Sequence, residues 1–73
     1  MKPDRDQIEV TVNGAPRSVP CDTTISHLLM ELGLEPRSLA VEKNRDLIPG
    51  TRHAECRLQA GDQLEIVTLA GGG

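Results

Sequence analysis

The fold is decided by the stretch TISHLLMELG, residues 24–33. Its apolar side chains recur at i, i+3, i+4 and i+7, the spacing of one helix face: Ile25, Leu28, Leu29 and Leu32. Asp22, Thr23 or Thr24 can cap the start of this helix, and Gly33 can end it in the left-handed conformation. No other segment shows a convincing helical period. A lone amphipathic helix must bury its apolar face, and the available surface is a sheet.

The segment before the helix predicts a β-hairpin. Ile8, Val10 and Val12 alternate with polar residues, the period-2 pattern of a strand with one buried face. Asn13-Gly14 follows, and this pair favours a tight turn in which both central residues have positive φ. The second strand runs through residues 17–19, and the prolines on either side of it place it toward an edge of the sheet.

The segment after the helix returns to strand patterns. Residues 39–42 form a short apolar strand, and residues 47–50 a shorter apolar patch closed by a Pro-Gly turn. A hydrophilic connector, residues 51–57, leads to a turn at residues 60–62. In the last strand, residues 64–69, Leu64 and Ile66 point to one face and Glu65 to the other.

The order of these elements predicts an α+β fold of the β-grasp, or ubiquitin-like, type. We expect a mixed sheet of four to five strands curved over one main helix, with the first and last strands side by side at its centre. Residues 1–73 read as a single domain, with a loose leader at residues 1–6 and a flexible glycine tail at residues 70–73. The chain is short enough that its core and its stability are modest.

Composition excludes several classes of function. Aromatic residues are absent, and they are the usual stacking platforms for single-stranded nucleic acids. The net charge of −3 disfavours contact with a phosphate backbone. No apolar run is long enough to span a bilayer, and the charged start lacks the features of a signal peptide. These observations predict a cytoplasmic protein with no membrane partner, in which Cys21 and Cys56 are reduced, partly buried thiols.

The chain closes on Gly71-Gly72-Gly73, directly after an apolar strand. Glycines add nothing to a core and lose much entropy when ordered, so we interpret them as a tail presented to another protein. A free carboxylate is ionised near neutral pH and is a poor electrophile, so it reacts only after activation, typically as a mixed anhydride with a nucleotide. Residues 70–73 can reach about 13 to 14 Å when extended, enough to thread a narrow tunnel.

Three stretches together resemble the ThiS family, the sulfur carriers of thiamin biosynthesis: residues 8–14, residues 39–44, and residues 58–67 running into the glycines. Two features depart from the family pattern. Arg45 stands where many relatives have glycine after the asparagine, and the tail has three glycines where a pair is usual.

The resemblance implies a protein substrate rather than an enzyme, with no bound cofactor and no metal. A ThiF-like enzyme would use ATP and Mg²⁺ to adenylate the carboxylate of Gly73, and sulfur from a cysteine desulfurase would replace AMP to give a thiocarboxylate. A ThiG-like thiazole synthase would receive that sulfur. Gly72 and Gly71 would let the end enter the partner's site.

Other polar and apolar residues are candidates for docking or for simple surface positions. Glu9, Glu42 and Glu65 fall on strands, as a solvent face or as contacts for a basic patch on the activating enzyme. Leu47, Ile48 and Leu69 form either a docking patch near the tail or part of the core; from this set we select Ile48 and Leu69, with Glu65, as candidate docking residues. His27 is read as a surface or boundary histidine on the helix, and His53 as a solvated loop residue without ligand partners.

Three alternatives remain open. The small subunit of molybdopterin synthase shares the fold and the thiocarboxylate chemistry, but its relatives tend to approach the glycines through aromatic and proline residues, unlike residues 66–70 here. A ubiquitin-like modifier would pass the same acyl adenylate to an amine. A free-standing β-grasp interaction module, regulatory or RNA-associated, would have no use for the tail.

Overall fold

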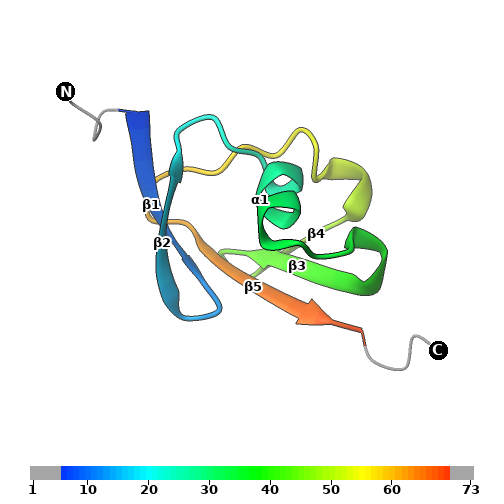
Figure 1. Ribbon diagram of the computed structural model, residues 1–73. Helices are drawn as coiled ribbons and strands as arrows, with labels where there is room; N and C mark the ends of the chain where they lie inside the picture. The colour runs from blue at the N-terminus through cyan, green and yellow to red at the C-terminus, as the bar shows by residue number, and fades with distance from the viewer. Residues whose placement is uncertain (1–5, 70–73) are drawn as a thin grey trace.

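A computed structural model describes residues 6–69 of the chain. This part contains one α-helix and five strands, with short 3-10 turns in some of the connections between them (Figure 1). Their order is β1 (Gln7–Val12), β2 (Ala15–Pro20), α1 (Ile25–Leu32), β3 (Leu39–Lys43), β4 (Asp46–Ile48) and β5 (Gln63–Thr68), with 3-10 turns at Pro36–Ser38 and Gly50–Arg52.

The strands form one mixed sheet in the order β2-β1-β5-β3-β4. β1 and β5 run parallel, and every other neighbouring pair is antiparallel. The first and last strands are therefore adjacent in the middle of the sheet, as predicted, and the α+β β-grasp architecture is confirmed. β2 lies at an edge of the sheet. Its residues Pro16 and Pro20 lack a backbone N–H, and an edge strand tolerates this because it has a neighbouring strand on one side only.

The hairpin between β1 and β2 turns at Asn13-Gly14, as the sequence predicts. Asn13 has φ 50° and Gly14 has φ 85°, the pair of left-handed residues that a two-residue hairpin of this twist requires. The hairpin between β3 and β4 uses the same geometry at Asn44 (φ 52°) and Arg45 (φ 73°). Here the second position carries a bulky side chain in a conformation that favours glycine.

Helix α1 is capped at both ends by residues that were predicted from the sequence. Thr24 has extended backbone angles, and its hydroxyl accepts a hydrogen bond from the backbone N–H of His27. Gly33 ends the helix with φ 71°, and its N–H reaches back to the carbonyls of Leu29 and Met30. Of the possible N-terminal caps, the structure thus selects Thr24.

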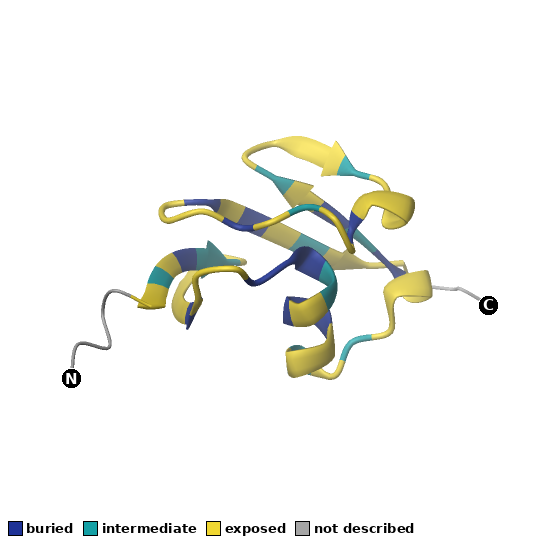
Figure 2. Ribbon diagram, turned by 90° about the horizontal axis from the view of Figure 1, so that it is seen from above, coloured by how far each residue is buried: buried dark blue, intermediate teal, exposed yellow. Residues whose placement is uncertain are grey.

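The core lies between α1 and the face of the sheet that α1 covers. Figure 2 shows buried positions interrupted by exposed ones along the strands, as expected for a sheet with one covered face. Nine apolar residues are buried there: Val10, Val19, Ile25, Leu28, Leu29, Leu39, Val41, Leu58 and Leu64. Each such side chain contributes about 1.5 to 3 kcal/mol relative to an exposed position. Within residues 6–69, no α-helix covers the opposite face of the sheet, which is called the uncovered face below.

Of the predicted leader, Asp6 belongs to the described part of the chain, and its carbonyl accepts a hydrogen bond from Cys21 N–H at 2.9 Å. The remaining leader residues, 1–5, and the predicted tail, residues 70–73, lie outside the described residues. Helix α1 is much too short to cross a bilayer, and no other helix within residues 6–69 has the length and apolar character to do so.

Candidate functional site

The candidate site is the strand that leads to the glycines. β5 lies between β1 and β3, and the strand pairing with β3 continues to its end, where Leu69 N–H donates to Ser38 O at 2.7 Å. Leu69 is half exposed, so the described chain reaches the surface at this point. Gly71, Gly72 and Gly73 lie outside the described residues, and their roles stay predictions.

One side of β5 is completed by a side chain instead of a strand. β1 pairs with β5 only as far as Val12↔Leu64, because the hairpin turn follows. Asn13 then continues the ladder. Its backbone N–H donates to Leu64 O at 2.8 Å, its side-chain N–H donates to Ile66 O at 3.2 Å, and its side-chain oxygen accepts from Ile66 N–H at 2.7 Å. The Asn13 side-chain amide therefore replaces a peptide group of β1. It extends the hydrogen bonding on this side of β5 from Leu64 to Ile66.

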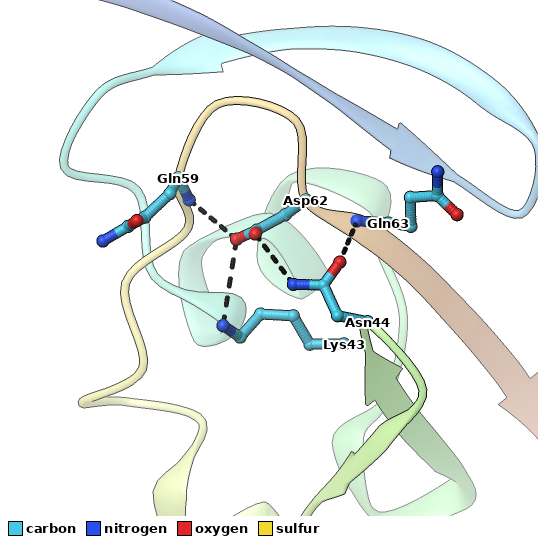
Figure 3. Close-up of polar contacts among 5 residues, drawn as sticks. All are labelled: Lys43, Asn44, Gln59, Asp62 and Gln63. Atoms are coloured by element: carbon cyan, nitrogen blue, oxygen red, sulfur yellow. Dashed lines mark hydrogen bonds and ion pairs between the residues drawn. The ribbon is translucent and has the colours of Figure 1, made fainter.

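The start of β5 is fixed by a polar cluster around Asp62 (Figure 3). The Asp62 carboxylate accepts a hydrogen bond from Gln59 N–H at 2.7 Å and from the Asn44 side chain at 3.0 Å, and Lys43 Nζ lies 3.9 Å away. Asn44 in turn accepts from Gln63 N–H at 3.0 Å. Asp62 is buried, yet all its contacts come from loops and strand ends. The cluster ties the β3–β4 turn to the turn that precedes β5.

The uncovered face of the sheet carries two opposed glutamates within the β3–β5 ladder. Glu42 of β3 and Glu65 of β5 are directly paired in the antiparallel register, and both are exposed. Leu47 pairs with Glu42 on the other side, and Val67 follows Glu65 on the same face of β5. A surface hollow of about 420 Å³ lies here, lined by Glu42, Asn44, Arg45, Gln63 and Glu65.

The structure brings together only some of the predicted docking residues. Glu65 and Leu69 lie on β5 or directly after it, and Leu69 is 51% exposed. Ile48 is a different case, because it pairs with Val41 and packs against the core, so it lies on the covered face away from Glu65. Leu47, which the sequence analysis did not select, is 63% exposed and lies on the uncovered face, where it pairs with Glu42. None of these placements tests docking, which stays a prediction.

The interpretation of His53 as a solvated loop residue is wrong. His53 is only 4% exposed, and its Nε2 lies 3.0 Å from Ile48 O. Its own carbonyl accepts from Ser26 N–H at 3.1 Å, which ties the connector after β4 to the first turn of α1. His53 is therefore a structural residue that links the edge strand to the helix. His27 is exposed, as expected.

The cysteines differ in burial. Both are free thiols; Cys56 is partly buried, as expected, whereas Cys21 is exposed. Within residues 6–69, no cluster of three histidine, cysteine or acidic side chains has the arrangement of a metal site.

The sequence analysis misses the two residues that fix β5. It assigns Asn13 to a turn, although a side-chain amide can supply both a donor and an acceptor, as a peptide group does. It likewise assigns Asp62 only to the turn at residues 60–62. Neither contact follows from local pattern, because Asn13 and Ile66 are 53 positions apart.

A family model and a solved structure both match this chain and name the same family. The ThiS family model matches residues 10–73. The solved structure of the thiamine biosynthesis protein (ThiS) from Geobacter metallireducens superposes with a TM-score of 0.78, at 26% identity over 90% of this chain and 100% of that one.

Two sequence relatives extend the comparison. Thiazole synthase of Paramagnetospirillum magneticum is 38% identical over 66 residues, which are 90% of this chain and 20% of that protein. The uncharacterized protein ycf40 of Pyropia yezoensis is 33% identical over 90% of this chain and 93% of its own length. This chain thus spans about a fifth of the length of the thiazole synthases that it matches.

Proposed function

Because this chain belongs to the ThiS family, we propose that it is the sulfur carrier for the thiazole moiety of thiamin, charged with sulfur at Gly73. The observation that carries the proposal is the family match, which extends through residue 73 and so includes the three glycines. The resemblance seen in the sequence is thereby confirmed at the level of the family and of the fold.

The position of β5 supports this role. β5 lies in the middle of the sheet, where Asn13 fixes it on one side as far as Ile66, and β3 with Ser38 fixes it on the other side as far as Leu69. Residues 70–73 then extend the reach by at most about 13 to 14 Å. Gly71 and Gly72 carry no side chain, so a partner can enclose the backbone closely.

The chemistry belongs to the partner enzyme and not to the carrier. A ThiF-like enzyme with ATP and Mg²⁺ joins the Gly73 carboxylate to AMP and releases pyrophosphate. A sulfur nucleophile then attacks the acyl carbon and AMP leaves, so that one carboxylate oxygen is replaced by sulfur. In the cell the sulfur derives from a cysteine desulfurase. The carrier supplies only the carboxylate, and it binds no cofactor of its own.

The receiving partner that we propose is a thiazole synthase. The relatives of that name contain a segment similar to this chain within a protein about five times as long. A carrier-like segment and a thiazole synthase therefore occur in one polypeptide in those proteins, which supports a direct association of the two here. The same comparisons favour thiamin over the molybdopterin pathway. We propose that this association takes place in the cytoplasm.

The test is a mass measurement on the intact 73-residue chain. The protein is incubated with ATP, Mg²⁺, a ThiF-type enzyme and sulfide, and we expect its mass to rise by the difference between sulfur and oxygen. Omitting ATP must abolish the gain. Deleting Gly72 and Gly73 must also abolish it while leaving the melting temperature unchanged, because these residues contribute nothing to the core.

Two results separate the alternatives. A conjugate with lysine side chains in place of a thiocarboxylate indicates a ubiquitin-like modifier. An unchanged mass with a partner enzyme that charges its own carrier rejects the sulfur-carrier function altogether.

A further inference from the structure

The Asn13-Gly14 turn has a chemical reactivity that is separate from its role in the hairpin. Asparagine is a thermolabile residue, and it reacts most readily before glycine, because glycine has no side chain to keep the next backbone nitrogen away from the asparagine amide. Both residues are exposed. A Cβ atom added to Gly14 would meet no other atom within 4 Å. The turn is therefore open to the water that a reaction of this amide requires.

In the folded protein the Asn13 amide is held against β5. Its N–H donates to Ile66 O at 3.2 Å, and its oxygen accepts from Ile66 N–H at 2.7 Å. Both bonds have to open before the Cγ atom of Asn13 is free to turn onto the Gly14 nitrogen. Two neutral hydrogen bonds slow a reaction that requires their opening by about ten- to hundredfold. The fold thus restrains this reaction without preventing it.

We propose that Asn13 is a site of spontaneous deamidation, restrained by Ile66 in the folded chain, and that its product loosens the end of β5. The Gly14 nitrogen gives its proton to hydroxide and attacks Cγ of Asn13. The new N–Cγ bond closes a succinimide ring, the bond from Cγ to the side-chain nitrogen breaks, and ammonia leaves with a proton taken from water. Water then adds to one of the two ring carbonyls, the ring C–N bond at that carbonyl breaks, and the Gly14 nitrogen regains a proton. The product has aspartate or isoaspartate at position 13.

Neither product holds Ile66 as asparagine does. An ionised carboxylate has acceptors only, so it can still receive the Ile66 N–H but faces Ile66 O without a proton between the two oxygens. Isoaspartate adds a carbon to the backbone and changes the geometry of the two-residue turn. In both products the hydrogen bonding on the β1 side of β5 weakens beyond Leu64, whereas the ladder with β3 remains.

The second hairpin offers a matched comparison within the same chain. Asn44 has φ 52° and Asn13 has φ 50°. The Asn44 amide is likewise occupied on both atoms, by the carboxylate of Asp62 and by the N–H of Gln63. The difference is the next residue, because Arg45 brings a bulky side chain beside the backbone nitrogen that would attack. We therefore expect Asn44 to react much more slowly than Asn13 under the same conditions.

The first experiment follows the full chain in mildly alkaline buffer, both folded and in urea. Proteolysis and mass spectrometry report the replacement of a side-chain NH2 by OH at each asparagine, and an isoaspartyl methyltransferase detects isoaspartate. We expect Asn13 to convert in both samples, about ten- to hundredfold more slowly in the folded one, and Asn44 to lag behind it in both. Equal rates at the two asparagines in urea reject the site. A rate at Asn13 that urea does not change, or no conversion of the folded chain within that range, also rejects it.

The second experiment tests the consequence with Asn13→Asp, and its control is Gln7→Glu. Gln7 lies at the other end of β1, and its side-chain oxygen accepts from the Ser18 hydroxyl at 2.8 Å, a bond that a glutamate keeps. The control therefore adds one negative charge without removing a contact to β5. We expect faster amide exchange at Ile66 in Asn13→Asp and unchanged exchange in Gln7→Glu. If Asn13→Asp does not fold, the deamidated wild-type chain, separated by ion exchange, gives the same measurement.

The effect on charging rests on the proposed function. KM for adenylation by the ThiF-type enzyme should rise several-fold in Asn13→Asp and in the deamidated chain, because the partner must then order the end of β5 itself. Unchanged exchange at Ile66 rejects the loosening of β5, whatever the enzyme does, and faster exchange with an unchanged KM rejects the effect on charging. Failure of the unmodified chain to be adenylated rejects the proposed function, whereas the deamidation rates and the exchange at Ile66 still decide the inference.

Discussion

Replacing Asp62 with alanine should be among the most destabilising single changes outside the apolar core. The carboxylate accepts hydrogen bonds from Gln59 N–H at 2.7 Å and from the Asn44 side chain at 3.0 Å, with Lys43 Nζ at 3.9 Å. Hydrogen bonds to a charged group each contribute about 1.5 to 3 kcal/mol. The separation of 3.9 Å makes the Lys43 contribution small, at most about 1 kcal/mol.

The free-energy contributions of these contacts are not lost in full, because the donors that lose Asp62 can form hydrogen bonds with water instead. Gln59 and Asn44 are both exposed, so their N–H groups regain solvent in the variant. We therefore expect a loss of about 2 to 3 kcal/mol, less than the sum of the separate contacts. A chain of this length has a total stability of about 4 to 11 kcal/mol, so the loss is a large share of it.

The assay is thermal and urea unfolding of the full chain. At about 4 to 8 °C per kcal/mol for a domain of this size, the melting temperature should fall by about 10 to 20 °C. The matched control is Asp46→Ala, which removes an exposed carboxylate from the other end of the β3–β4 turn and should change stability by less than about 0.5 kcal/mol. An Asp62 variant that melts as the control does would refute the assignment of Asp62 as the residue that fixes the start of β5.

Three further substitutions test the remaining local claims. Asn13→Gly keeps the positive φ of the turn and removes only the side-chain bonds to Ile66, so it should cost about 1 to 2 kcal/mol and speed amide exchange at Ile66; unchanged exchange there contradicts the role of Asn13. Arg45→Gly places a glycine in a left-handed conformation and should raise the free energy of unfolding by up to about 1 kcal/mol, seen as a higher urea midpoint. A lower midpoint counts against strain at this turn. Thr24→Ala removes the helix cap and should cost about 1 kcal/mol, whereas Thr24→Ser should stay close to wild type in the same unfolding assay.

Local signals predicted the elements of this fold well. The helix face of Ile25, Leu28, Leu29 and Leu32, the cap at Gly33 and the Asn13-Gly14 turn each depend on residues within a few positions of one another. Once one amphipathic helix and several short strands are established, the helix has one place to pack, and the β-grasp arrangement follows. These are the features for which chain order and spacing carry the information.

Features that depend on register were not predictable in the same way. β4 has only three residues, two of them adjacent apolar ones, so no alternation shows that Leu47 faces solvent and Ile48 faces the core. The pairing of Glu42 with Glu65 requires the alignment of β3 with β5, which no local pattern sets. His53 lies in a polar segment, and its burial arises from contacts with Ile48 and Ser26 that the segment itself does not reveal.

The two fixing points of β5 connect the stability of the fold to the proposed transfer of sulfur. Fixing the backbone of one residue costs about 1 to 2 kcal/mol of conformational entropy. The bonds of Asn13 to Ile66 and of Leu69 to Ser38 already hold the last residues of β5 in the free protein. A partner that binds the chain end therefore does not have to order residues 67–69, and this part of the conformational entropy cost is absent from the binding free energy. If Asn13→Gly releases this stretch, the KM for adenylation should rise, although the side-chain hydrogen bonds of Asn13 within residues 6–69 go to Ile66. Such a rise would show that the carrier contributes to its own activation by being ordered before it binds.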